Sequence, residues 1–120
     1  MSTARALLAD VDVFLAEGNI RRGVGKFANN MLAASENSRF QEQKLTLLFG
    51  TSEIIKSVAS NVATIIRCSK PIKLTVNVAP STMPTVFTVN SLFIYTGELG
   101  DITIANDSTT VDSKVTFLQI

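Results

Sequence analysis

The sequence predicts a mainly β protein, an antiparallel β-sandwich of jelly-roll-like type that follows an N-terminal helical arm or helical hairpin. Three observations support this fold class. From about residue 39 the apolar residues repeat with a period of two. Polar turn clusters separate these short runs at intervals of roughly 8–12 residues. No alternation of strands with helical segments follows residue 40, which argues against a doubly wound α/β fold. We therefore divide the chain into an arm, residues 1–38, and a sandwich domain, residues 39–120.

The arm shows helical spacing in two segments. Ser2 or Thr3 is a suitable N-cap for the first helix, and Gly18 is a suitable residue to end it. The apolar residues with helical spacing are Leu7, Leu8, Val11, Phe14 and Leu15 in the first segment and Ile20, Val24, Phe27 and Met31 in the second. Helices this short are marginal in water, so we expect the arm to pack on something.

Two features of the arm favour strands instead. Residues 10–13 alternate polar and apolar, although Phe14 and Leu15 interrupt the alternation. Gly23 and Gly25 would each destabilise a helix by about 1 kcal/mol relative to alanine. We retain the helical interpretation as the prediction for residues 1–38.

The sandwich domain is predicted to contain eight short strands. The clearest is the run 72–78, in which Ile72, Leu74 and Val76 share one face and Lys73 lies on the other. The run Gly97–Asp101 is interpreted as a hairpin connection between the strands beside it. The predicted strands are 45–49, 53–58, 62–68, 72–78, 86–89, 92–95, 101–105 and 115–119.

The charges of the chain are few and unevenly placed. Eleven basic and ten acidic residues give a net charge of +1, which does not suit a nucleic-acid-binding protein. Residues 1–73 carry a net charge of +4 and residues 74–120 a net charge of −3. This asymmetry fits either chance placement on solvated faces or head-to-tail docking of copies.

The run Leu74–Gly97 contains 24 consecutive residues without a formal charge. Its prolines, asparagines and many hydroxyl side chains do not suit a membrane-spanning helix, and no N-terminal signal pattern is present. Charged residues are depleted in the cores of protein interfaces. With 46% apolar residues and a mean hydropathy of +0.29, the chain is predicted to be soluble and to have this surface covered by another protein.

No catalytic constellation is predicted. The chain has no histidine, so arrangements that pair serine, cysteine or a metal with histidine do not apply. Cys68 is expected to be buried and inert, because Arg67 points to the opposite face of its strand. The run Gly23-Val24-Gly25-Lys26 lacks the serine or threonine that a phosphate-binding loop requires after its lysine.

The remaining polar candidates are predicted to be turn residues. Glu98, Asp101, Asp107 and Asp112 lack the spacing of a calcium-binding loop. The triplet Asn106-Asp107-Ser108 matches a glycosylation acceptor but is interpreted as a turn. Phe87, Phe93 and Tyr95 share one parity and are expected to fill the core. We therefore predict no catalytic residues, no metal, no cofactor and no enzymatic activity.

The run Asn61–Val76 consists of a strand, a Ser-Lys-Pro turn and an alternating strand, and the run Phe93–Asn106 of a hydrophobic strand, a Thr-Gly turn and an Ile-Thr-Ile strand. Through these two runs, residues 40–120 resemble small virion proteins of tailed bacteriophages, and the second run is similar to the final hairpin of those proteins. The resemblance implies a β-sandwich structural subunit of a capsid decoration, neck or tail fibre, with no catalytic residues. The N-terminal arm is not part of it.

Two hypotheses for function follow. The first is a structural protein of the virion that associates with copies of itself, as a trimer or ring, and docks on other virion proteins through its arm, without nucleic acid or membrane. The second is a carbohydrate- or receptor-binding β-sandwich module. The uncharged run Leu74–Gly97 distinguishes them, because only the first requires it to be buried between subunits.

Overall fold

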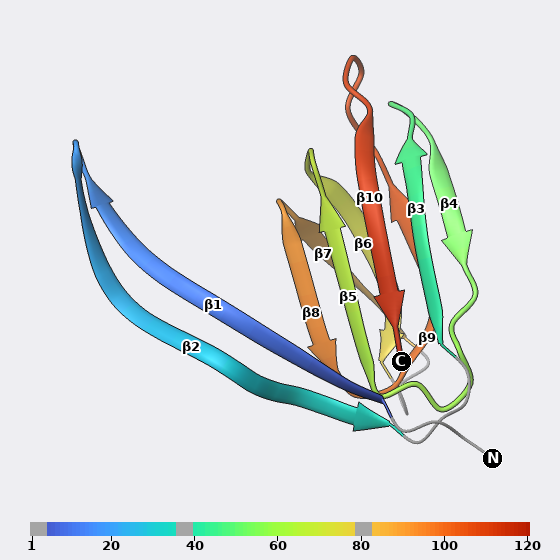
Figure 1. Ribbon diagram of the computed structural model, residues 1–120. Coiled ribbons are helices and arrows are strands. Elements are labelled where there is room, and N and C mark those ends of the chain that lie inside the picture. The colour runs from blue at the N-terminus through green and yellow to red at the C-terminus, as the bar shows by residue number, and fades with distance from the viewer. Residues whose placement is uncertain (1–4, 36–39, 79–82) are drawn as a thin grey trace.

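The computed structural model describes residues 5–35, 40–78 and 83–120, and all regular structure in them is β-strand. A two-stranded hairpin precedes two four-stranded antiparallel sheets (Figure 1). The described residues contain no helix that could cross a membrane. The strands are β1 (Arg5–Glu17), β2 (Ile20–Ser35), β3 (Gln41–Leu47), β4 (Ser52–Ile55), β5 (Ala63–Cys68), β6 (Ile72–Val78), β7 (Pro84–Val89), β8 (Leu92–Thr96), β9 (Leu99–Ala105) and β10 (Ser113–Gln119).

The two sheets are linked by a chain that passes repeatedly from one to the other. One sheet has the strand order β3-β10-β5-β8 and the other the order β4-β9-β6-β7. From β3 onward, β6 and β7 are the only consecutive strands that lie side by side in one sheet. Each sheet therefore depends on the other for its own assembly.

The period-two prediction for residues 39–120 is confirmed. Along β6, Ile72, Leu74 and Val76 are buried while Lys73 is exposed. The eight predicted strands correspond to β3 through β10, with ends that differ by a few residues. Both sheets contribute to one core, whose buried members are Leu47, Ile55, Ile66, Cys68, Ile72, Leu74, Val76, Val89, Leu99, Ile102, Ile104, Val115 and Phe117.

The predicted hairpin connection at residues 97–101 is wrong. The strands on either side of it, β8 and β9, belong to different sheets, and β9 already begins at Leu99. Gly97 has a φ of 138°, and a Cβ there would lie 2.9 Å from a ring carbon of Tyr95. The glycine is needed because the chain changes sheets within two residues, close to an aromatic ring.

The helical arm is not what the structure shows. Residues 5–35 form a long antiparallel hairpin, in which β1 pairs with β2 along nearly its whole length. The Gly18-Asn19 pair makes the turn, with Gly18 at a φ of 59°, and glycine at the first central position suits the tight turns of β-hairpins. A glycine with positive φ serves a helix end and a hairpin turn equally well, so Gly18 could not distinguish the two.

The apparent helical period of the second arm segment has a physical origin in bulges of β2. Val13 and Phe14 are consecutive on β1 but pair with Gly25 and Gly23, so the extra residue at this register shift is Val24 on β2. A bulge adds one residue to a strand and reverses the parity of the residues that follow. Gly23, which disfavours a helix, pairs with Phe14 at this point. The proposed caps Ser2 and Thr3 and the domain boundary at residue 38 lie outside the described residues.

Candidate functional site

The two sides of the sandwich differ in charge. The edge strands β3 and β4 form one side, and the edge strands β7 and β8 form the other (Figure 1). Edge strands carry unpaired backbone N–H and C=O groups, which another chain can pair with unless they are protected. We therefore compare how each side is protected.

The side formed by β3 and β4 carries charges of both signs. Glu42 and Lys44 are exposed on β3, and Glu53 is exposed on β4. Charged side chains on an edge strand discourage pairing with another strand, because such pairing would remove them from water. This side therefore has charged protection at its edges, although Ile54 on β4 is 66% exposed.

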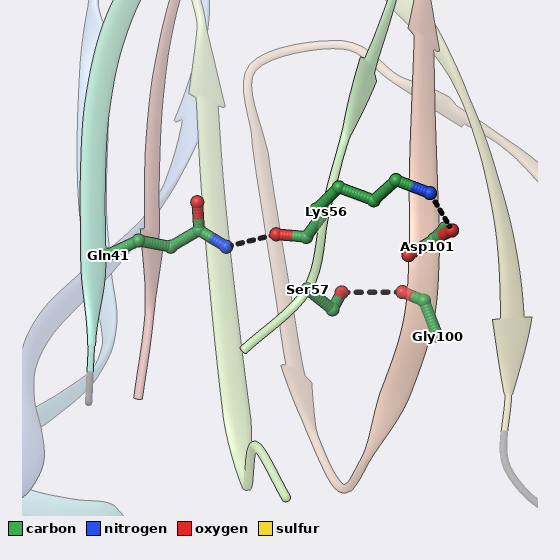
Figure 2. Close-up of polar contacts among 5 residues, drawn as sticks. All are labelled: Gln41, Lys56, Ser57, Gly100 and Asp101. Carbon is green, nitrogen blue, oxygen red and sulfur yellow. Dashed lines mark hydrogen bonds and ion pairs between the residues drawn. The ribbon is translucent and has the colours of Figure 1, made fainter. Parts of the chain in front are cut away.

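Polar contacts also close this side, as Figure 2 shows. The Gln41 side-chain amide on β3 donates to the backbone carbonyl of Lys56, which follows β4. Lys56 Nζ lies 2.8 Å from Asp101 Oδ2 on β9, and the Ser57 hydroxyl donates to the Gly100 carbonyl. The segment after β4 is thereby fastened to both sheets.

A buried amide supports the same segment. Gln119 is fully buried at the end of β10. Its Oε1 accepts from the Val58 N–H at 2.7 Å, and its Nε2 donates to Ser57 Oγ at 3.2 Å and to Thr64 Oγ1 at 3.0 Å. These bonds satisfy the buried amide. They also fix the position of Ser57 and Val58, in the segment that connects β4 of one sheet to β5 of the other.

The opposite side, which we call the uncharged flank, consists of β7 and β8 with Met83. It lies wholly within the uncharged run Leu74–Gly97. Its exposed large apolar side chains are Met83, Val86, Leu92 and Ile94, which keep 76%, 60%, 54% and 39% of their surface in solvent. No charged residue protects this edge, and its one proline, Pro84, stands at the start of β7.

The apolar surface continues from the uncharged flank onto the outer face of its sheet. Ile94 pairs in register with Ile65, and Ile65 pairs with Leu118 on the next strand. Ile65 and Leu118 pack with the buried Ala63 and Ile120, apart from the main core. The solvated face of an antiparallel sheet is ordinarily polar, so this row of three aliphatic residues, which ends at Glu42 on β3, departs from the usual pattern.

The outer face of the other sheet provides a contrast. The corresponding row across it runs from Val86 through Thr75 and Thr103 to Ile54. The two central positions are threonines, which are polar and favour strands. The aliphatic row is therefore a property of the sheet that contains β8.

The aromatic residues close the core beneath the uncharged flank. Phe87, Phe93 and Tyr95 are half-buried and pack against the main core, as the sequence predicted. The ring centroids are 5.4 Å apart for Phe87 and Phe93 and 6.4 Å for Phe93 and Tyr95. These rings face the interior and do not form an outward platform of the kind on which sugars stack.

The structure places Cys68 as predicted. It is 5% exposed on β5, with its Sγ 3.4 Å from the Val89 carbonyl oxygen, while Arg67 is exposed. Burial raises the pKa of the Cys68 thiol. A buried thiol with a raised pKa is a poor nucleophile.

The Gly23–Lys26 run lies within β2 and not before a helix. A phosphate-binding loop places its glycines between a strand and a helix N-terminus, where free backbone N–H groups surround the phosphate. Gly23 and Gly25 instead pair with Phe14 and Val13 of β1. The run is therefore part of a paired strand and does not form a phosphate-binding loop.

Three acidic residues of the C-terminal half each have their own partner, and the fourth, Glu98, is exposed between β8 and β9. Asp101 pairs with Lys56, and Asp107 pairs with Lys73 at 3.0 Å, both on the surface. Asp112 Oδ1 accepts from the Phe49 N–H. Among the described residues, no group of three metal-ligating side chains occurs. Two acids of the negative half thus meet lysines of the positive half within one chain, so part of the charge asymmetry is satisfied internally.

Asn106 is a structural residue that sequence reasoning undervalued. The predicted turn is present, because Asn106 Oδ1 accepts from the Ser108 N–H. The side chain is also buried, and its Nδ2 donates to the carbonyls of Leu47 and Val111. An amide held in this way inside the fold is not accessible for glycosylation.

An apolar pocket of about 390 Å³ lies at one end of the sandwich. It opens between the start of β6 and the loop after β9, and the ion pair of Lys73 with Asp107 joins two of its lining residues. The lining residues are Lys70, Pro71, Ile72, Lys73, Thr88, Asp107, Ser108 and Val111. Its size is within the range of small-ligand sites, although no catalytic arrangement accompanies it.

The chain matches no protein-family model, and neither a curated protein nor a solved structure is significantly similar to it. The resemblance to phage virion proteins therefore rests on the residues named for it.

Proposed function

We propose that this chain is a non-enzymatic structural subunit of a tailed-phage virion, a capsid decoration, neck or tail component that associates with copies of itself. The observation that carries the proposal is the uncharged flank with the aliphatic row beside it. An edge of two strands without charged residues next to an apolar sheet face is a hazard for a protein that stays alone in solution. The same features are useful in a subunit whose neighbours cover them.

The strand order supports the proposal. Two facing sheets with the orders β3-β10-β5-β8 and β4-β9-β6-β7 form an eight-stranded β-sandwich of jelly-roll type. Jelly rolls are common in capsid proteins, and they also occur in lectins and cupins. A fold alone does not establish a function, so the argument for a virion subunit combines the fold, the flank and the sequence resemblance.

The alternative is a carbohydrate- or receptor-binding module. Its binding site would be the apolar pocket between Lys70 and Val111, since the aromatic residues face the core. This alternative requires no association between copies, so the two proposals differ in the size of the particle in solution.

Light scattering on the purified chain tests the proposal. We expect a defined oligomer for the natural sequence and a smaller species for Leu92→Glu, which places a charge on the uncharged flank. Thr46→Glu is the matched control, because Thr46 is an exposed residue near the other edge of the same sheet and its variant should keep the oligomer. A monodisperse monomer that binds glycans on an array would overturn the proposal in favour of the alternative.

A further inference from the structure

Among the strands that the structure describes, β1 and β2 pair only with each other, so each has one unpaired edge. The hairpin β1–β2 forms a separate two-stranded sheet, and Figure 1 shows it extending away from the sandwich. Its strands contain 13 and 16 residues, so at about 3.4 Å per residue β1 alone extends roughly 44 Å. An isolated two-stranded hairpin is at best marginally stable in water. Such a long hairpin needs further strands beside it.

The two strands carry opposite charges. The acidic residues Asp10, Asp12 and Glu17 and one arginine give β1 a net charge of −2. Arg21, Arg22 and Lys26 give β2 a net charge of +3, with no acidic residue. Within the hairpin, Asp12 and Lys26 hold directly opposite positions. The outer edge of the hairpin on the β1 side therefore belongs to an acidic strand, and the outer edge on the β2 side belongs to a basic strand.

We propose that hairpins of neighbouring copies pair β1 to β2 and so form one shared antiparallel sheet. This inference rests on the self-association proposed above and identifies the hairpin as a second contact between copies. Pairing β1 with β1, or β2 with β2, would bring like charges together, which destabilises neighbouring strands. Pairing β1 of one copy with β2 of the next brings opposite charges together. Charge thus selects one of the three ways in which two hairpins can meet.

This selection has a consequence for symmetry. A two-fold axis at the contact would require the same strand from both copies, so β1-to-β2 pairing is a head-to-tail contact. When copies are related by rotation about an axis along the hairpins, all hairpins point the same way. Then β1 of one copy runs antiparallel to β2 of the next, as in the hairpin itself. When the rotation closes, the repeated contact gives a ring of copies with no two-fold axis at the contact.

Charge reversal in the full chain tests the proposal. One variant carries Asp10→Lys and Asp12→Lys, so that both strands are basic, and a second carries Arg22→Glu and Lys26→Glu, so that both strands are acidic. We expect each variant alone to lose the mass of the natural assembly in native mass spectrometry. We expect an equimolar mixture to form oligomers that contain both variants.

The fourfold variant is the decisive control. It combines the four substitutions, restores opposite charges on the two strands and should regain the natural mass. If either twofold variant keeps the natural mass, or if the mixture stays unassociated, the pairing of hairpins is overturned. That outcome, together with loss of the oligomer in Leu92→Glu, would leave the proposed function standing. A monomeric natural protein would instead remove the proposed function itself.

Discussion

Single buried side chains decide how firmly the sandwich domain is held. The clearest polar example is Asn61, which is 2% exposed; its Nδ2 donates to the carbonyls of Val58 and Leu99, and its Oδ1 accepts from the Leu99 N–H. Sequence reasoning did not identify Asn61 or Gln119. The sequence did contain a signal that Gln119 is buried, because Gln119 follows the apolar residues Val115 and Phe117 with a period of two. Which backbone groups these amides satisfy depends on pairings between distant strands, which local patterns do not reveal.

Val76→Asp should unfold the domain. Val76 is 1% exposed on β6, between β7 and β9, and a carboxylate there would be buried without a partner. We expect a loss on the order of 4 kcal/mol or more, measured by urea denaturation. Val86→Asp is the control, because Val86 is 60% exposed and its variant should keep the fold. Equal stability of the Val76 variant and the natural protein would refute the burial assigned to β6.

The Cys68 thiol predicts a pH dependence of stability. Because burial raises its pKa in the folded state, the thiol of the unfolded chain ionises at a lower pH, about 8.5, than the thiol of the folded chain. The stabilisation from Cys68 is therefore fully present below that pH and is lost as pH rises through the folded pKa. We expect the free energy of unfolding to fall more steeply at alkaline pH for the natural protein than for Cys68→Ala. Parallel pH profiles for the two proteins would contradict this account.

At the scale of the element, the type of a segment could be predicted where its own sequence pattern determines it, and could not be predicted where pairing with another segment determines it. The run 72–78 was predicted with both ends because its apolar face is continuous and turn residues bound it. The second arm segment was predicted as helical because bulges, one of them at Val24, interrupt the strand period of β2. The bulges are set by pairing between β1 and β2, so this segment read alone gave the wrong period.

Deleting residues 1–34 tests the hairpin as a separate element. No strand of the sandwich pairs with β1 or β2, so we expect the truncated chain to keep the folding transition of the sandwich domain. We also expect it not to be incorporated into the proposed particle, because in our proposal the hairpin makes contacts with neighbouring copies. Circular dichroism follows the fold, and co-sedimentation with assembled particles follows incorporation. Normal incorporation of the truncated chain would show that the hairpin is not the anchor.

At the scale of the whole molecule, the arrangement of charge has a simple spatial form. The strand order puts β3 and β4, with their charged residues, on one side and β7 and β8 on the other. The sequence analysis recognised the uncharged run and predicted that it is covered. It did not predict that the run supplies an edge strand to each sheet, nor that Ile94 continues into a row with Ile65 and Leu118. Those relations follow from strand order, which is set by contacts far apart in the chain.

Amide hydrogen exchange along β7 and β8 is the most direct measurement of whether neighbours cover the uncharged flank. It compares the natural protein, at a concentration where light scattering finds the oligomer, with Leu92→Glu under the same conditions. We predict slow exchange on the outer edges of β7 and β8 in the natural assembly and fast exchange in the variant, with β3 and β4 alike in both. Equally fast exchange of β7 and β8 in both proteins would mean that this edge stays in water, and it would contradict the account.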